Sequence, residues 1–181
     1  DFIGEGSAVF VKRMLAARKI EDTPEIFSAW HAEFVAQYEF AVDKAVFYPG
    51  VTAVLTALKA AGHTLGLCTN KPQRATHVVL QHMKIYTLFD AVVAGGMCGS
   101  RKPDPEMLLR VLHELGDRPA LYVGDSEIDA ETARRAAVPF ALFLGGYRKT
   151  PAEQMHRDWD FEHFDALLPI VATLAAHHIS A

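Results

Sequence analysis

Two aspartates, Asp125 and Asp129, follow a short apolar run that ends in a Gly-Asp pair. A buried strand with this ending carries a carboxylate to the rim of a parallel sheet, where open α/β folds bind their ligands. Hard divalent cations such as Mg²⁺ need only one or two protein carboxylates beside phosphate oxygens and water. The pattern therefore predicts a Mg²⁺ site beside a phosphate. The alternative is a plain turn, since Asp and Ser also favour helix N-caps.

Two upstream segments add groups that can bind phosphate. The apolar run 65–68 ends in Thr69 and Asn70, whose hydroxyl and amide can bond a phosphate oxygen. Lys102 stands directly before a Pro-braced helix start, and an ammonium opposite acidic groups is a natural phosphate clamp. Each feature alone could be a strand-end turn or a solvated surface charge. All three in this order, each at a strand end, favour one phosphate site.

These motifs resemble motifs two, three and four of the haloacid dehalogenase superfamily. The matching segments are Thr69-Asn70, Lys102 within Arg-Lys-Pro-Asp-Pro, and Gly124-Asp125 with Asp129. Details resemble its phosphoglycolate phosphatase branch: Phe2-Ile3-Gly4-Glu5-Gly6 at the start of the cap, Tyr48-Pro49-Gly50-Val51 at the return to the core, Cys68-Thr69-Asn70-Lys71-Pro72, and the stretch Gly145 to Pro151. The resemblance runs over nearly the whole chain.

One motif of that family has no counterpart here. Motif one is Asp-x-Asp-x-Thr on the first strand, and its first Asp is the nucleophile. Asp1 precedes no acid at the required spacing. Asp158-Trp159-Asp160 spaces two acids correctly, but Phe161 and Glu162 follow it, so we expect a polar loop. The resemblance thus implies the supporting half of an active site, and we expect the sequence to be a fragment that is inactive alone.

For function, the resemblance implies Mg²⁺-dependent hydrolysis of a small phosphorylated metabolite through an aspartyl-phosphate intermediate, with phosphoglycolate as the first candidate. Asp125 and Asp129 would be the metal ligands, with Asp129 alternatively orienting the lysine. Thr69, Asn70 and Lys102 would hold the transferred phosphate and act in catalysis. The helical cap would close over the substrate and exclude water.

Other functions remain open at this point. A related small-molecule phosphatase or a phosphomutase would use the same core residues. If the chain is complete, a catalytically silent binding module fits. A receiver-type signalling domain also places Asp, Thr and Lys at strand ends, but there the Lys follows the phosphorylated Asp, whereas Lys102 precedes Asp125.

Composition limits the partners. The 181 residues carry a net charge of −4, which disfavours a nucleic-acid surface because such a surface needs a basic stripe. No apolar run approaches the length of a membrane span. Cys68 and Cys98 lie far apart without metal-type spacing, so neither a zinc site nor a disulfide framework is indicated. We expect a cytoplasmic enzyme, monomeric or homodimeric.

Hydrophobic periodicity predicts an α/β protein that has a parallel sheet with helices on both faces. The resemblance implies that this sheet is Rossmann-like and that a small α-helical cap accompanies it. Residues 1–47 would form a partial cap, with Thr23 capping a helix that has Pro24 at its first position. Residues 48–181 would form a core that lacks its first strand. In the family's strand order that strand lies between the strands predicted at 65–68 and 121–123. We therefore expect a gap between these two strands.

Overall fold

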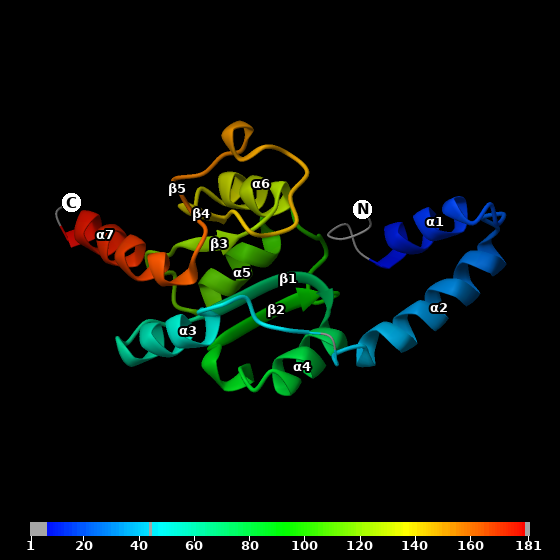
Figure 1. Ribbon diagram of the computed structural model, residues 1–181, viewed down its shortest axis with the longest axis horizontal. Coiled ribbons are helices and arrows are strands. Elements are labelled where there is room, and N and C mark those ends of the chain that lie inside the picture. Colours follow the sequence, from blue (N-terminus) through cyan, green and yellow to red (C-terminus); the bar gives the residue numbers. More distant parts are fainter. Residues whose placement is uncertain (1–6, 44, 180–181) are drawn as a thin grey trace.

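The computed structural model describes residues 7–43 and 45–179. Helices α1 (Ser7–Ala17) and α2 (Pro24–Phe40) pack against each other and lie to one side of the sheets (Figure 1). The Thr23 Oγ1 atom accepts a hydrogen bond from the Ile26 backbone N–H at 3.3 Å, which confirms the predicted cap of α2. The rings of Phe10 and Phe34 stack with their centroids 4.6 Å apart, so aromatic contacts join the two helices.

The remaining chain alternates strands and helices, as expected for an α/β fold. The helices are α3 (Val51–Ala60), α4 (Gln73–His82), α5 (Glu106–Glu114), α6 (Glu127–Ala136) and α7 (Leu167–Ile179), with short 3-10 turns at Tyr86–Leu88, Ala152–Gln154 and Phe164–Ala166. The strands are β1 (Gly66–Pro72), β2 (Ala91–Gly95), β3 (Tyr122–Gly124), β4 (Phe140–Phe143) and β5 (Trp159–Phe161). All the strand pairs are parallel, so their carboxyl ends point to the same rim.

The strands form two sheets rather than one. One sheet pairs β1 with β2, and the other has the order β3-β4-β5. In the first sheet the pairing is regular up to Thr69 opposite Ala94 and resumes at Pro72 opposite Gly95. The intervening Asn70 and Lys71 form a bulge on β1. Bulges redirect side chains and are common beside active sites.

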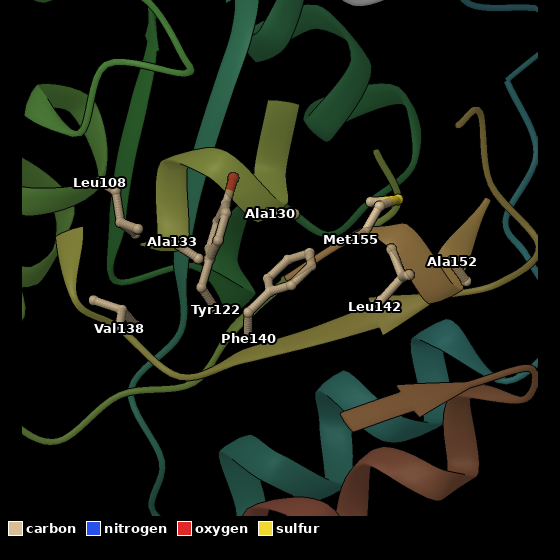
Figure 2. Packing of buried hydrophobic residues seen from close by; sticks show 9 residues of the cluster. All are labelled: Leu108, Tyr122, Ala130, Ala133, Val138, Phe140, Leu142, Ala152 and Met155. Carbon is tan, nitrogen blue, oxygen red and sulfur yellow. The ribbon is translucent and has the colours of Figure 1, made fainter. Parts of the chain in front are cut away.

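The main hydrophobic cluster lies between α6 and the second sheet (Figure 2). Tyr122 on β3 and Phe140 on β4 lie next to each other, with ring centroids 5.9 Å apart. Ala133 on α6 is completely buried, and its small side chain lets the helix approach the sheet closely. The burial of these apolar side chains holds α6 against the sheet. It thereby also fixes Asp129 on α6 and Asp125 in the loop before it.

The prediction of a polar loop at 158–160 is wrong, because Trp159–Phe161 is strand β5. It pairs with β4, and Ala141 lies opposite Trp159. Asp158 also closes the end of the ladder, since its Oδ2 atom accepts a hydrogen bond from the Phe140 backbone N–H at 2.7 Å. Phe161 is 4% exposed while Asp160 faces solvent. A short edge strand of this kind can therefore carry acids without losing its burial on the other face.

The expected gap is present between the two sheets. Across the described residues no strand pairing joins β1 to β3, and a cavity of about 790 Å³ lies between them. Its walls are mainly apolar and include Leu67 on β1, Val123 on β3 and Leu167 on α7. Val123 is 37% exposed because β3 is an edge strand of its sheet. The facing edges of β1 and β3 thus offer unpaired backbone groups on either side of an apolar groove.

Candidate active site

The predicted site residues line one cleft of about 800 Å³ at the carboxyl rim of the strands, beneath α1 and α2. The structure brings all of them to it: Thr69, Asn70, Lys102, Asp125 and Asp129. Helix α1 contributes Ser7 and Phe10, and α2 contributes Phe34 and Tyr38. The convergence expected from the order of the motifs is therefore confirmed, while the roles of the individual residues stay predictions.

Lys102 is the centre of the site. Its Nζ atom lies 2.7 Å from Asp129 Oδ1 and donates further hydrogen bonds to the Cys68 carbonyl at 3.1 Å and the Tyr122 hydroxyl at 3.0 Å. Only 11% of the side chain is exposed. An ammonium whose three N–H groups all donate to protein oxygens has a fixed position, so its charge acts on the cleft without further ordering.

Asp129 is fully engaged by the protein. Its Oδ1 atom accepts from Lys102 and, at 2.9 Å, from the Tyr122 hydroxyl. Its Oδ2 atom accepts from the Ser126 hydroxyl at 2.6 Å and from the backbone N–H groups of Asp125 and Ser126. Asp129 and Ser126 form a capping box at the start of α6. This geometry favours the lysine-orienting role of Asp129, and its role as a metal ligand stays a prediction.

Charge and burial shift three pKa values in this cluster. Burial alone would raise the pKa of Asp129, but the Lys102 charge and the hydrogen bonds from Lys102, Ser126 and Tyr122 lower it overall. Burial, reinforced by the Asp129 charge, raises the pKa of the Tyr122 hydroxyl well above its ordinary value. Burial also raises the pKa of the Cys68 thiol to about 11, although the Lys102 charge acts in the opposite direction. The carboxylate is thus kept ionised while its neutral neighbours stay protonated.

The side chains of Asn70 and Thr69 form hydrogen bonds with the backbone at and beside the β1 bulge. The Asn70 amide brackets the backbone of Lys102, donating to its carbonyl at 3.0 Å and accepting from its N–H at 2.9 Å. Thr69 Oγ1 accepts from the Lys71 N–H at 3.1 Å, which leaves the hydroxyl proton available to a ligand. Asn70 therefore positions the lysine loop, while the phosphate-binding role of Thr69 stays a prediction.

Asp125 is held at the rim by the loop after β4. Its Oδ2 atom accepts from the Tyr147 backbone N–H at 2.8 Å. A Cβ atom on Gly146 would lie only 2.2 Å from that side chain, so the loop can approach Asp125 only because residue 146 is glycine. Among the described residues the other Asp125 oxygen has no hydrogen-bond partner, and it remains available to a cation.

The residues present fit a Mg²⁺ ion only in part. Mg²⁺ binds through one or two carboxylates and keeps phosphate and water oxygens in its shell. Asp125 meets this need, and the groove between β1 and β3 opens beside the loop that carries it. Within 7–43 and 45–179, however, no three His, Cys, Asp or Glu side chains gather closely enough to hold a metal.

Sequence reasoning missed several residues of the site. Tyr122 was hidden in an apolar run, and nothing local distinguishes a buried tyrosine that bonds a carboxylate from one that only packs. Ser126 carried a signal, because a Ser followed three residues later by an acid is the capping-box pattern. Lys71 and Tyr38 meet only through the fold: the Lys71 Nζ donates to the Tyr38 hydroxyl.

Comparison with known proteins supports one family. The family model described as haloacid dehalogenase-like hydrolase matches residues 1–143. The chain is 39% identical over 178 residues to the phosphoglycolate phosphatase of Cereibacter sphaeroides strain ATCC 17029, covering 97% of this chain and 81% of that protein. It is 36% identical over 170 residues to the phosphoglycolate phosphatase of Rhodobacter capsulatus, covering 94% and 78%.

The fold has close counterparts among solved structures. A crystal structure titled as a predicted phosphoglycolate phosphatase from Haemophilus somnus 129pt superposes with a TM-score of 0.86, at 29% identity over 94% of this chain and 79% of that one. A helix long and apolar enough to cross a membrane is absent from the part of the chain that the structure describes. The chain therefore belongs to the haloacid dehalogenase-like hydrolase family, among its phosphatases of the phosphoglycolate phosphatase-like branch.

Proposed function

We propose that the protein is a Mg²⁺-dependent hydrolase of small phosphomonoesters, with phosphoglycolate as its first candidate substrate. The observation that carries the proposal is the buried pair of Lys102 and Asp129 at the floor of a cleft that also contains Thr69 and Asp125. This set supplies a fixed positive charge, a hydroxyl donor and a carboxylate with one free oxygen in a part-enclosed space. The substrate rests on the curated relatives, which are named phosphoglycolate phosphatases.

The residues divide the work of binding. The Thr69 hydroxyl donates to an equatorial oxygen of the phosphoryl group, and the Lys102 charge stabilises the negative charge that is spread over these oxygens during transfer. Asn70 fixes the peptide of Lys102, and Asp129 fixes its ammonium. Asp125 would hold a Mg²⁺ ion, which supplies charge neutralisation between attacking carboxylate and phosphate when bound.

The attacking group must come from outside the described residues. In an aspartyl-phosphate mechanism a carboxylate oxygen forms a bond to phosphorus while the ester oxygen leaves as an alcohol, and water then cleaves the acyl phosphate. Asp129 has both oxygens engaged by protein donors, and Asp125 is the proposed Mg²⁺ ligand. Glu127, the third carboxylate of the cleft, accepts from the Lys149 backbone N–H at 3.2 Å. We therefore assign the nucleophile to an extended strand that fills the groove between β1 and β3 and pairs with both edges.

A graft tests this proposal. An apolar strand ending in Asp-x-Asp-x-Thr is fused before the chain through a flexible linker, and phosphate release from phosphoglycolate is measured with Mg²⁺ or with a chelator. We expect Mg²⁺-dependent turnover from the graft and none from the chain alone. The matched control replaces the first Asp of the graft with Asn, which keeps the strand but removes the nucleophile.

Two substitutions in the chain complete the test. Asp125→Asn in the active graft should lower kcat by at least a hundredfold, because the ion site contributes several kcal/mol of charge stabilisation. Turnover by the purified chain without a graft, or full activity of Asp125→Asn, would show that the chemistry lies elsewhere.

A further inference from the structure

Lys71 occupies an unusual place between the core and the helices above it. It belongs to the bulge of β1, which turns Asn70 toward the Lys102 loop and Lys71 toward α2. There its Nζ atom donates to the Tyr38 hydroxyl and lies 4.0 Å from the centre of the Tyr38 ring. Both side chains are half-buried and line the same cleft as Lys102. A second ammonium thus enters the cleft beside the phosphate site.

The backbone that carries Lys71 is fixed. The buried Thr76 hydroxyl contacts the Lys71 carbonyl oxygen at 3.2 Å. On the other side, a Cβ atom on Gly95 would lie 2.4 Å from the Asn70 carbonyl oxygen and 3.1 Å from that of Lys71, so β2 packs directly against the bulge. The bulge thus fixes where the Lys71 side chain starts, and the contacts with Tyr38 hold its ammonium end, which reduces the ordering needed for binding.

The electrostatics distinguish Lys71 from Lys102. The Lys102 charge is balanced by Asp129 at 2.7 Å. No carboxylate of the described residues lies within salt-bridge distance of the Lys71 ammonium, which contacts the Tyr38 phenol. Because the Tyr38 oxygen accepts from Lys71, its hydroxyl proton is left to donate. The two residues therefore offer an ammonium and a hydroxyl donor side by side.

We propose that Lys71 and Tyr38 bind a second anionic group of the substrate, a carboxylate adjacent to the phosphate ester. This subsite rests on the proposed function, and it makes the enzyme selective for phosphorylated acids over neutral phosphomonoesters.

The test compares two substrates and one charge change. In the active graft, kcat/KM is measured for phosphoglycolate and for ethyl phosphate, which is of similar size but lacks the carboxylate. Lys71→Met should lower the value for phosphoglycolate at least tenfold, the loss typical of a charge-assisted hydrogen bond, and change that for ethyl phosphate less than twofold. Lys71→Arg should recover part of the loss, and Tyr38→Phe should cause a smaller loss with the same selectivity.

Lys12→Met is the matched control, because Lys12 also lies over a ring of the helical pair, 5.5 Å from the Phe27 centroid, but does not line the cleft. It should leave both substrates unchanged. An equal loss on both substrates, or no loss, would overturn the subsite and leave the proposed function intact.

A binding measurement separates the two proposals. Calorimetry on the chain itself compares phosphoglycolate with inorganic phosphate. Lys71→Met should weaken phosphoglycolate at least tenfold and leave phosphate unchanged. If the graft hydrolyses neither substrate, the proposed function fails, and this titration still decides the subsite: equal affinities of the variant and the original chain for phosphoglycolate would refute it.

Discussion

The Lys102 ammonium and the Asp129 carboxylate lie 2.7 Å apart with 11% and 8% of their side chains exposed. Such a pair is expensive to desolvate, and it persists here because Ser126, Tyr122 and two backbone N–H groups satisfy the remaining lone pairs of Asp129. We therefore expect the pair to contribute little net stability. Its main effect is to hold the Lys102 ammonium in the cleft.

Breaking this pair from one side should be costly. Asp129→Asn leaves the Lys102 charge buried and unbalanced, so we expect the free energy of unfolding to fall by about 3–5 kcal/mol in urea titrations. Glu114→Gln, which opens the exposed pair with Arg110, is the control and should change stability little. Comparable effects of the two substitutions would mean that the buried pair is better solvated than its exposure indicates.

The stability of the protein should depend on pH through the Asp129 carboxylate. The pKa of Asp129 is lowered in the folded chain, so its ionised form stabilises the fold above the ordinary value of about 3.9. This contribution is lost as pH falls through the folded pKa. We expect unfolding free energy, measured from pH 6 to pH 2.5, to decline more steeply below about pH 4 in the original chain than in Asp129→Asn.

Glu131 titrates in the same acid range and must be separated. Hydrogen bonds from Arg134 and Arg135 lower its pKa to about 2. The difference between the two stability curves removes this shared component, and a flat difference would contradict the assignment to Asp129.

The Cys68 thiol should resist alkylation at neutral pH. Burial raises its pKa to about 11, and the thiolate is the reactive form. In a Cys98→Ala background, the rate of modification by iodoacetamide followed by mass spectrometry should rise about tenfold per pH unit up to about pH 11. A midpoint near the ordinary value of about 8.5 would show that Cys68 faces water.

Gly146→Ala should disable the cleft by moving Asp125. The added methyl group would lie 2.2 Å from that side chain, so either the loop or the carboxylate must shift, and the 2.8 Å bond from the Tyr147 N–H would break. We expect at least a tenfold fall in kcat of the active graft, together with weaker Mg²⁺ dependence. Gly99→Ala is the control, because its added methyl would meet nothing closer than 3.6 Å.

Much of the fold could be predicted because its signals are local. The spacing of apolar residues and the Gly and Pro residues at the boundaries predict the helices α3 to α6. The site residues could be gathered from motif order alone, since the carboxyl ends of parallel strands meet at one rim. What failed was non-local: β5 spans three residues with an acid in its middle, and only its pairing with β4 makes it a strand.

The bulge at Asn70 and Lys71 was also beyond prediction. It exists because Thr69 and Pro72 take consecutive partners on β2, which no feature of the β1 sequence states by itself. The contact between Lys71 and Tyr38 follows from that bulge and from the position of α2, so the subsite could be found only in the folded chain.

The open edges of β1 and β3 have a consequence for handling the protein. Among the described residues no strand pairs with the edges of β1 and β3 that flank the apolar groove, so these edges are a template for any extended chain, including another copy of the same molecule. At high concentration the protein should therefore self-associate by strand addition, and Val123 and Leu67 should form apolar contacts with the added strand. A peptide or graft that occupies the groove should therefore reduce this self-association, in addition to supplying the nucleophile.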